Sequence, residues 1–525
     1  MDKGARTCWP DFFRRNRAAT QPGLIAAALV GLTSIATLAC RSPIEVAATP
    51  SVLLITIDTL RADALSLYGN PVPTSPALDQ FMRRGTVFQQ AFATASFTAP
   101  SHTSILTGLY PSFHTVGPYN GYYALAQETP TLAGLARDAG VATGAVVSNP
   151  VLASYLGLGH GFDVYDDRMT GAEVNRPSPE RYAPEAVDTI LAQLDAMAGR
   201  QFFLWFHMQD PHGPYAPEYE AERLAGATYP DSDRRLTVGD DHSGHRSIPA
   251  YQRFPSDSED GRVGDYRRRY DAEVALVDDE ISRLIARLEE DPGLANTYVV
   301  ITADHGEAMG ADDFYFGHSH SVGHAQVRVP LAIIGPDVPA GLTVDAPVSI
   351  RDVFPTVLQV MGIAMPEALP PGVSALPGAA TDLVAAARVA SRQSLLDLAN
   401  GTARRPPEPV FLESANQVGV VLGKTFLQRD RFGPEDPIWS RPNPNTLSFW
   451  KPLGETAHGL ERVGAPDGAR SFTAADPAAV ERLRGLLDRY ERFAREAYAA
   501  IQDRAEPTAI ADTLSDSLRA LGYIR

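Results

Sequence analysis

Short apolar runs alternate with helical segments along most of the chain. The run SVLLITI (51–57) is continuously apolar, which is typical of a strand buried on both faces of a sheet. The segment TSPALDQFMRRG (74–85) has a polar cap, Pro76 in its first turn and Gly85 as a terminator, which predicts a helix. Strands that alternate with helices predict an α/β fold, in which helices sandwich a large, mainly parallel sheet.

The same alternation continues to about residue 365. Further strands are predicted at 86–93, 141–148, 201–208, 297–304 and 329–336. Further helices are predicted at 96–108, 129–140, 184–199, about 266–290 and 349–362. We therefore expect residues 50–365 to form one large domain, which would be the catalytic domain if the chain is an enzyme.

Three other segments depart from this pattern. Residues 216–262 are polar and rich in Asp, Pro, Gly and Arg, so they are predicted to be an insertion or a lid. Residues 366–408 cluster Pro, Gly and Ala and are predicted to be a linker. Residues 409–525 contain two strand-like runs and an amphipathic helix at 477–498, which predict a smaller C-terminal α+β subdomain.

Residues 1–40 are predicted to be an export signal. Arg14, Arg15 and Arg17 precede the uncharged run at 23–39, and the small residues before Cys40 resemble a bacterial lipoprotein processing site. Processing there would leave Cys40 as the lipid-bearing first residue. The predicted location is the periplasm or cell envelope, with the chain attached to a membrane through Cys40. A retained anchor and a plain secretory cleavage are the alternatives.

Charge and cysteine content narrow the chemistry. The formal net charge of −17 argues against a nucleic-acid partner, because phosphate backbones select basic surfaces. Both cysteines, Cys8 and Cys40, precede the predicted fold. The fold therefore contains no disulfide, no cysteine metal site and no catalytic cysteine.

The stretch SFTAPSHTSILTG (96–108) places hydroxyls and an imidazole at a helix start, with Gly108 as its stop. A helix N-terminus attracts anions such as phosphate or sulfate. Thr98 is therefore either a nucleophile for an anionic ester or, together with Ser101, simply a helix cap.

Hard metal ligands gather where the predicted strands end. In a doubly wound sheet these ends form the ligand-binding edge, and carboxylates with imidazole suit calcium, magnesium, manganese or zinc. The candidates are Asp58, His207, Asp210, His212, Asp304 and His305. Any single Asp after a strand is more simply explained as a helix cap, but several such strand ends together are not.

Five motifs in order carry a family resemblance. They are LLITIDTLRADALSLYG (53–69), TAPSHTSILTGLYP (98–111), FLWFHMQDPHGPYAP (203–217), ITADHGEAMG (301–310) and FGHSHSVGHAQVRVPLAIIG (316–335). Together they resemble the sulfatase family of the alkaline phosphatase superfamily, with an echo in LRALGYIR at the C-terminus. The resemblance implies a large α/β domain beside a smaller C-terminal antiparallel sheet.

The resemblance also implies roles for individual residues. It makes Asp58, Asp304 and His305 ligands of a divalent metal ion, with Thr98 as the nucleophile and a further ligand. Further residues have implied roles near the anion. They are His212 at the substrate or its leaving group, His318 and His320 over the anion, and His102 in place of the signature's arginine. Surface histidines in a flexible loop are the alternative for His318 and His320.

The chain departs from the family at the nucleophile and around it. True sulfatases oxidise a cysteine or serine to formylglycine, and Thr98 cannot form that aldehyde. Ser148 and Asn149 stand where the family has an anion-binding lysine. Thr59 replaces a second aspartate, which favours one metal ion over two, although Asp210 and His320 could supply a second site.

These departures favour phosphorus chemistry. A threonine alkoxide suits attack on phosphorus, and superfamily members with threonine at this position look like phosphodiesterases, phosphonate ester hydrolases and phosphotransferases. The sequence therefore predicts a metal-dependent hydrolase of phosphate or phosphonate (di)esters whose partner is a small anionic ester. The alternatives are a sulfuric ester hydrolase that works without formylglycine, a phosphotransferase, and an inactive binding protein with the same fold.

Overall fold

The computed structural model describes most of the chain after the predicted export signal. The described residues are 49–116, 124–173, 178–215, 224–229, 232–239, 244–253, 260–366, 394–402, 408–414, 417–430, 455–460 and 475–502. The predicted signal, including Cys40, and the C-terminal motif LRALGYIR lie outside them, as does most of the predicted linker. The unit described below begins after Pro43, where the chain divides into two parts.

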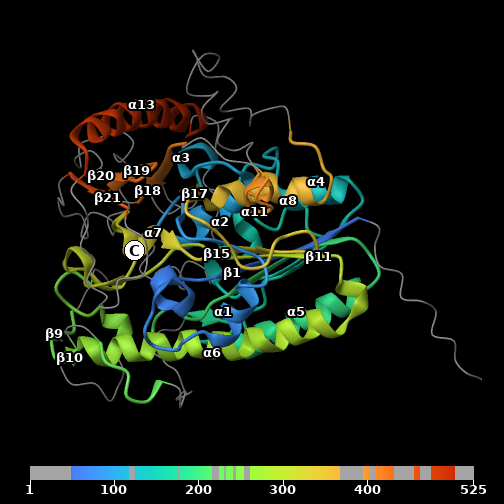
Figure 1. Cartoon of the computed structure of the whole chain (residues 1–525), viewed down its shortest axis with the longest axis horizontal. Helices are drawn as coiled ribbons and strands as arrows, with labels where there is room; N and C mark the ends of the chain where they lie inside the picture. Colours follow the sequence, from blue (N-terminus) through green and yellow to red (C-terminus); the bar gives the residue numbers. More distant parts are fainter. Residues whose placement is uncertain are drawn as a thin grey trace, which may run out of the picture. The chain divides into compact units, whose positions relative to one another are not determined.

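An eight-stranded sheet forms the centre of this unit (Figure 1). In spatial order its strands are β16 (Leu342–Val344), β2 (Thr86–Phe88), β15 (Leu331–Ile334), β11 (Thr297–Ala303), β1 (Ser51–Ile57), β8 (Phe202–Met208), β4 (Ala142–Val146) and β5 (Val164–Asp166). The predicted strand at 51–57 is therefore a central strand, buried along its whole length.

Most neighbours in this sheet run parallel. Strand β1 is parallel to both β8 and β11, and β4 is parallel to β8 and β5. Strand β15 is antiparallel to both of its neighbours, β11 and β2. The predicted α/β fold with a mainly parallel sheet is confirmed, and the reversed strand β15 makes the sheet mixed.

Helices cover both faces of the sheet (Figure 1). On one face, α6 packs against α1 and α5, and α5 contacts β4 and β8. On the other face, α8 packs against α2 and α4 and reaches β1. The bounds are α1 (Pro76–Met82), α2 (Thr98–Thr107), α4 (Leu132–Asp138), α5 (Ala183–Met197), α6 (Val263–Glu290) and α8 (Val353–Val360).

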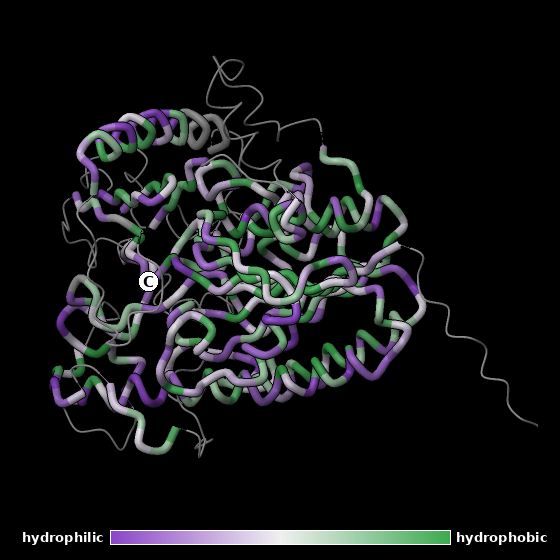
Figure 2. Tube along the Cα trace, viewed as in Figure 1, coloured by the Kyte–Doolittle hydropathy of each residue, from purple (hydrophilic) through white to green (hydrophobic). Residues whose placement is uncertain are grey.

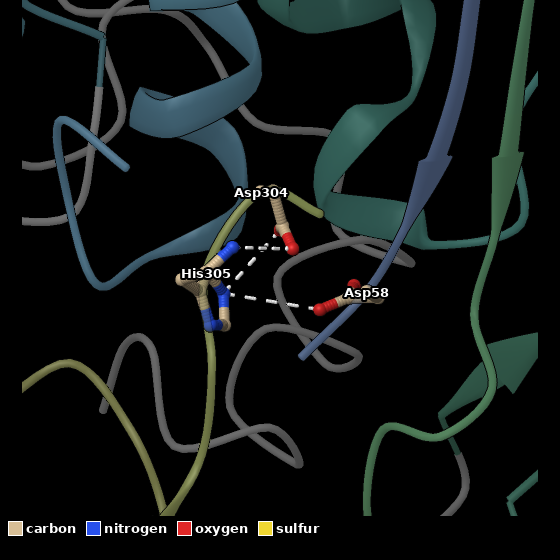
Figure 3. Close-up of side chains that lie close together, drawn as sticks. All are labelled: Asp58, Asp304 and His305. Carbon is tan, nitrogen blue, oxygen red and sulfur yellow. Dashed lines mark hydrogen bonds and ion pairs between the residues drawn. The ribbon is translucent and has the colours of Figure 1, made fainter. Parts of the chain in front are cut away.

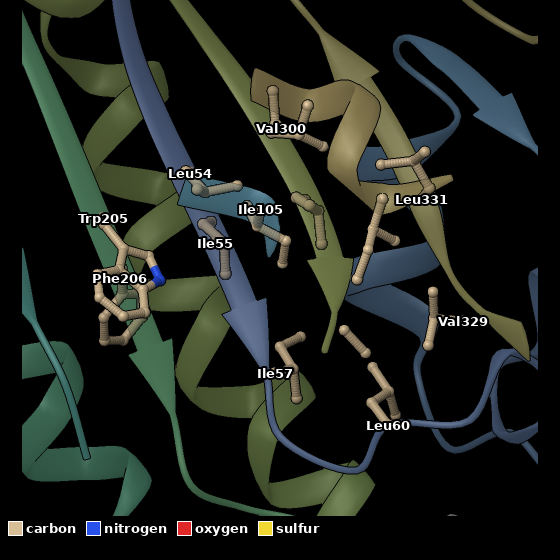
Figure 4. Close-up of a cluster of buried hydrophobic side chains, with 14 of the residues drawn as sticks. Leu54, Ile55, Ile57, Leu60, Ile105, Trp205, Phe206, Val300, Val329 and Leu331 are labelled. Atoms are coloured by element: carbon tan, nitrogen blue, oxygen red, sulfur yellow. The ribbon is translucent and has the colours of Figure 1, made fainter. Parts of the chain in front are cut away.

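The core lies between the sheet and these helices. Leu54, Ile55 and Phe206 from β1 and β8 are at most 1% exposed, and Figure 4 shows them along the two neighbouring strands. Full burial of side chains of this size contributes about 1.5–3 kcal/mol each. In Figure 2 the strands at the centre are largely apolar, whereas the long helix α6 alternates apolar and polar residues. This packing holds the ends of β1, β8 and β11 in fixed positions.

Two local predictions are wrong in detail. The predicted strand at 86–93 is two short strands in different sheets, because β3 (Ala91–Phe92) pairs with β14 (Arg328–Val329) and β17 (Val348–Ser349) instead. Gly85 does not terminate α1 through a left-handed turn. It allows close approach of strands, since a Cβ there would lie 2.1 Å from the carbonyl oxygen of Ile333.

A four-stranded antiparallel sheet follows the main domain along the chain. It contains β18 (Val410–Glu413), β19 (Gln417–Leu422), β20 (Thr425–Asp430) and β21 (Thr456–Gly459), and helix α13 (Pro477–Gln502) packs on β19 and β20. Helix α13 also contacts α3 (Pro111–His114) of the catalytic part.

Smaller elements complete the described structure. They are the pair β6 (Gly171–Ala172) and β7 (Pro179–Glu180), the pair β9 (Arg235–Thr237) and β10 (Asp260–Arg262), the pair β12 (Ala308–Met309) and β13 (Tyr315–Gly317), and helices α7 (His324–Val327) and α11 (Leu396–Ala399). A search of the described residues found no helix that combines the length and the apolar character needed to cross a membrane.

A buried carboxylate links the C-terminal sheet to the catalytic part. Glu413 at the end of β18 accepts hydrogen bonds from the Ser112 hydroxyl (2.6 Å), the Ser112 N–H (3.2 Å) and the Tyr490 hydroxyl (2.5 Å). The Tyr490 ring also stacks on Phe411 at 4.1 Å between centroids. The carboxylate therefore connects three segments that are far apart in sequence.

Removing one of these hydrogen bonds should lower the stability. We expect Tyr490→Phe to reduce the free energy of unfolding by about 1.5–3 kcal/mol, since a hydrogen bond to a buried charge is lost. Tyr182→Phe, the same change at a residue 37% exposed, should cost about 0.5 kcal/mol or less. Urea denaturation of both variants checks this, and equal effects would contradict the role given to Glu413.

Candidate active site

Parallel pairing brings two carboxylates to one edge of the sheet. Ile57 of β1 pairs with Ala303 of β11, so the next residues along each strand, Asp58 and Asp304, emerge side by side. His305 follows directly. One ligand atom from each of these three residues lies within 4.8 Å of the others, and all three residues are completely buried (Figure 3).

Each carboxylate uses one oxygen within the protein and leaves the other for the site. Oδ2 of Asp58 accepts a hydrogen bond from the Asn149 amide (3.0 Å), and Oδ1 of Asp304 accepts from the N–H groups of Thr59 (3.2 Å) and His305 (2.8 Å). Oδ1 of Asp58 and Oδ2 of Asp304 have no hydrogen-bond partner within the described part of the chain. Because buried carboxylate oxygens without a partner are costly, this arrangement fits a bound cation.

The backbone fixes which nitrogen of His305 faces this group. Its Nδ1 lies 2.9 Å from the carbonyl oxygen of Gly306, which only accepts, so Nδ1 carries the proton. Nε2 therefore presents a lone pair, 3.3 Å from Oδ2 of Asp304 and 3.8 Å from Oδ1 of Asp58. These are the same two oxygens that lack partners. Two carboxylate oxygens and one imidazole nitrogen thus converge as a donor set suited to a divalent ion.

The ionisation of the group reflects its burial. Burial raises the pKa of Asp304 well above its ordinary value, and the negative charge of Asp58 adds to this effect. Burial also acts to raise the pKa of Asp58, but its interactions with His207 and His212 outweigh burial and hold that pKa below the ordinary value. Two carboxyl groups so close together cannot both ionise without a compensating cation.

Thr98 enters the group from the helix start. It is the first residue of α2, and its Oγ1 lies 3.2 Å from Nε2 of His305. The cap residue is Phe97, no side chain caps the helix, and the hydroxyl of Ser101 donates to the carbonyl oxygen of Asp304 at 2.5 Å. The alternative in which Thr98 and Ser101 are caps is therefore wrong. Gly108 ends the helix in a left-handed conformation, as predicted.

Two of the predicted histidines lie beside the group. The ring of His318 is 4.5 Å from that of His305 and 5.2 Å from that of His212, between centroids. Nδ1 of His318 lies 3.4 Å from the carboxylate of Glu307, which also accepts a hydrogen bond from Tyr215. An incoming anion would therefore meet imidazoles at this side of the site.

Asp210 and His320, the residues considered for a second metal ion, belong to other networks. Asp210 accepts a hydrogen bond from the N–H of Ala183 at 2.8 Å, and His320 stacks on Phe314 at 3.6 Å between ring centroids. Neither belongs to a group of three or more potential metal ligands among the residues that the structure describes. Among the described residues, only Asp58, Asp304 and His305 form such a group.

His102 is completely buried and lies one helical turn after Thr98 in α2. Its Nδ1 is 3.5 Å from Oδ2 of Asp304 and 2.8 Å from the carbonyl oxygen of Thr98. Burial, and next the neighbouring His207, lower the pKa of His102 to about 3. The ring is therefore uncharged at neutral pH.

Two residues hold Asp58 in a way that the sequence did not predict, since His207 was a candidate metal ligand and Asn149 stood at the position of an anion-binding lysine. Asn149 donates to Asp58 as described above, and Nε2 of His207 lies 3.4 Å from the same oxygen. The N–H of Ser148 donates to Nδ1 of His207 at 3.2 Å, so the proton of this ring is on Nε2 and points at Asp58. A signal existed for His207, since it lies at a strand end. The register that pairs it with Thr56 of β1 is known only from the fold.

Thr59 contributes through its backbone. It adopts a left-handed conformation with φ of +54°, which is unfavourable for a β-branched residue. In this conformation its N–H reaches Asp304, while its carbonyl oxygen accepts a hydrogen bond from Tyr270 at 2.8 Å. Backbone strain at this point orients a carboxylate of the site.

Comparison with known proteins agrees with this architecture. Residues 50–363 match the sequence model of the Sulfatase family. Arylsulfatase K of Xenopus laevis is 23% identical over 348 residues, which cover 60% of this chain and 64% of that protein, just under two thirds of its length. Choline-sulfatase of Rhizobium meliloti is 27% identical over 376 residues, which cover 62% of this chain and 71% of that protein.

Solved structures share the fold. The phosphonate monoester hydrolase of Silicibacter pomeroyi superposes with a TM-score of 0.58 at 21% identity and covers 85% of this chain and 95% of that chain. A 2-O glycosaminoglycan sulfatase superposes with a TM-score of 0.61 at 18% identity and covers 88% of this chain and 98% of that chain. The family match places the chain among ester-hydrolysing enzymes. The chain belongs to the sulfatase family.

The donor set predicts how substitutions change metal binding. Isothermal titration with Mn²⁺ after chelation should detect one site, and Asp304→Asn should abolish it because a ligand oxygen is lost. His207→Gln should weaken binding by about 10–100-fold, the usual effect of removing an outer-shell partner. Asp210→Asn is the matched control and should bind Mn²⁺ as the unmodified chain does. Unchanged binding by Asp304→Asn would contradict this donor set.

Proposed function

We propose that this chain is a metal-dependent hydrolase of phosphate or phosphonate esters, including diesters, and that Thr98 is its nucleophile. The observation that carries the proposal is the contact of Thr98 Oγ1 with Nε2 of His305, the nitrogen that faces the unpartnered oxygens of Asp58 and Asp304. A hydroxyl in a completely buried group of this kind has no simpler role, since it caps nothing.

Asp58, Asp304, His305 and Thr98 would hold one divalent ion. When bound, such an ion lowers the pKa of the threonine hydroxyl and neutralises charge on the group being transferred. Calcium, magnesium, manganese and zinc all suit the donor set.

The protein residues then have distinct tasks. Thr98 gives up its proton to water, and its oxygen forms a bond to phosphorus while the bond from phosphorus to the leaving alcohol breaks. His212 lies on the substrate side of the site and donates a proton to that alcohol. Water next attacks the phosphothreonine, releases the phosphate or phosphonate and restores the hydroxyl.

The identity of the nucleophile favours phosphorus over sulfur. Thr98 cannot form the aldehyde hydrate through which a sulfatase expels sulfate, whereas a phosphothreonine can be hydrolysed directly. The phosphonate monoester hydrolases of Silicibacter pomeroyi and Agrobacterium radiobacter share this fold, which supports the proposal.

Hydrolysis of sulfate esters without formylglycine is the second candidate. It is favoured by the sequence relatives, which include Arylsulfatase K and choline-sulfatase. Transfer of the phosphoryl group to another hydroxyl instead of water is a variant of the first candidate. The retained metal-ligand group argues against an inactive binding protein.

A set of chromogenic esters with added Mn²⁺ tests the proposal. We expect turnover of a phosphonate monoester or a phosphodiester and little turnover of a sulfate ester. Thr98→Ala should lower kcat by about 10⁴-fold or more, because it removes the atom that forms the intermediate. Thr98→Ser should retain measurable activity, since it keeps the hydroxyl.

Thr103→Ala is the matched control for these variants. Thr103 lies on the same helix, is buried, and donates only to the carbonyl oxygen of Ala99. It should leave kcat close to that of the unmodified chain. Near-normal turnover by a folded Thr98→Ala variant would exclude Thr98 as the nucleophile, and preferential turnover of the sulfate ester would favour the second candidate.

We propose that the enzyme acts in the cell envelope. The charged start, apolar run and Cys40 of the N-terminal segment support export and lipid attachment. This segment lies outside the described residues, so the support comes from the sequence alone.

Mass spectrometry of the mature protein from a bacterial host tests lipid attachment. We expect the mature chain to begin with a lipidated Cys40, and Cys40→Ser to abolish the modification. Cys8→Ser, which changes the other cysteine, should leave processing intact. A mature chain that begins upstream of Cys40 without a lipid would contradict the proposal.

A further inference from the structure

A chain of hydrogen bonds runs from the sheet to the helix start that carries Thr98. Trp205 of β8, Thr56 of β1 and His102 of α2 are all completely buried. The indole Nε1 of Trp205 lies 3.0 Å from Oγ1 of Thr56, and Nε2 of His102 lies 3.0 Å from the same oxygen. Nδ1 of His102 lies 2.8 Å from the carbonyl oxygen of Thr98.

The direction of the bonds at the two ends of this chain is determined. An indole N–H only donates and a carbonyl oxygen only accepts, which fixes the two ends. Nδ1 of His102 must therefore carry the proton that it donates to Thr98. Nε2 on the other side of the ring is within hydrogen-bond distance of the Thr56 hydroxyl, which accepts from Trp205.

The strands place this chain of bonds beside the metal-ligand group. Thr56 and Asp58 are two residues apart on or just after β1, and Trp205 and His207 are two apart on β8, so each pair projects from one face of the sheet. The same two strands therefore orient Asp58, through His207, and the helix start, through His102.

Thr98 is held at two points. Its Oγ1 faces His305, and its carbonyl oxygen is held by His102. Fixing the peptide group that follows Thr98 helps to fix the position of its Cα–Cβ bond, from which the hydroxyl projects. A shift of about 1 Å at a nucleophile can cost about 10²-fold in rate.

We propose that Trp205, Thr56 and His102 form a positioning relay that holds the backbone of Thr98 so that its hydroxyl points at the metal-ligand group. His102 in this role is a positioning residue that contacts neither substrate nor leaving group. The proposal rests on Thr98 being the nucleophile.

Two substitutions of His102 distinguish the contribution of Nδ1 from that of Nε2. The amide nitrogen of asparagine is bonded to Cγ, as Nδ1 of histidine is, so His102→Asn retains a donor for the Thr98 carbonyl. Glutamine carries its amide one atom further out, near the position of Nε2, so His102→Gln loses that donor. We expect His102→Gln to lower kcat by about 10²-fold and His102→Asn to lower it by about 10-fold or less. KM should be unchanged in both, and Mn²⁺ affinity should change by less than kcat, because Asp58, Asp304 and His305 still hold the ion.

A second pair keeps the test decisive if the His102 variants do not fold. Thr56→Val removes the hydroxyl at nearly constant volume, and Thr56→Ser restores it. We expect Thr56→Val to lower kcat by about 10-fold with unchanged KM and a smaller change in Mn²⁺ affinity. Thr56→Ser should recover most of the loss, which a purely structural role for the Thr56 methyl group would not produce.

Thr98→Ala measured in parallel distinguishes this proposal from the one on which it rests. An active Thr98→Ala variant overturns the nucleophile and the relay together. An inactive Thr98→Ala variant combined with equal kcat values for the glutamine and asparagine variants overturns the relay alone. Equal kcat values for Thr56→Val and Thr56→Ser have the same consequence. A loss of Mn²⁺ affinity in step with kcat would also overturn it, by placing the effect on the metal-ligand group.

Discussion

Two carboxylates that face one another in a completely buried space constrain the whole site. Asp58 and Asp304 leave the ends of adjacent parallel strands, and neither can move without disturbing the centre of the sheet. Burial and the charge of Asp58 raise the pKa of Asp304, whereas His207 and His212 outweigh burial and hold the pKa of Asp58 below its ordinary value. The protein satisfies the outer oxygen of each carboxylate and leaves the inner ones facing His305. A cation is the partner that completes such an arrangement, because it allows both groups to ionise.

Main-chain groups fix the imidazoles around this pair. A carbonyl oxygen holds Nδ1 of His305, a peptide N–H holds Nδ1 of His207, and the carbonyl oxygen of Thr98 holds Nδ1 of His102. Each ring therefore has one tautomer and one orientation before any ligand arrives. Such preorganisation is how outer partners tune a metal-dependent site. The three rings differ in their tasks because Nε2 faces a different group in each. It faces the metal-ligand position in His305, the carboxylate of Asp58 in His207 and the hydroxyl of Thr56 in His102.

The C-terminal sheet supports the site from a distance. The loop that carries His318 continues to Ser321, whose hydroxyl donates to the side chain of Gln417 in β19 at 3.1 Å. On the other side of the same sheet, Glu413 binds Ser112 and Tyr490. Through these contacts the smaller sheet supports both the loop that carries His318 and the segment around Ser112 that follows α2.

The sequence by itself determined the local elements and the chemistry that they carry. Continuous apolar runs identified buried strands, Gly108 identified the end of a helix, and ordered motifs identified the sulfatase family, because these signals depend on neighbouring residues. Candidate ligands such as Asp58 and Asp304 were visible for the same reason, as each follows a strand. Periodicity could not reveal that β15 runs antiparallel within the sheet, since strand direction depends on how the connections pass over it.

Only the tertiary structure decided which of these candidates meet. Asp210 and His320 carry suitable ligand atoms, but these atoms interact with other groups. His207 and Asn149, in contrast, hold Asp58 although they lie 149 and 91 residues away from it in the sequence. The assignment of His102 to Thr98, and of Thr98 to His305, likewise depends on the depth at which α2 packs on the sheet. The physical reason is that hydrogen bonds and metal ligands require distances of about 3 Å or less. Strand register and helix packing set such distances, and no local pattern in the sequence encodes them.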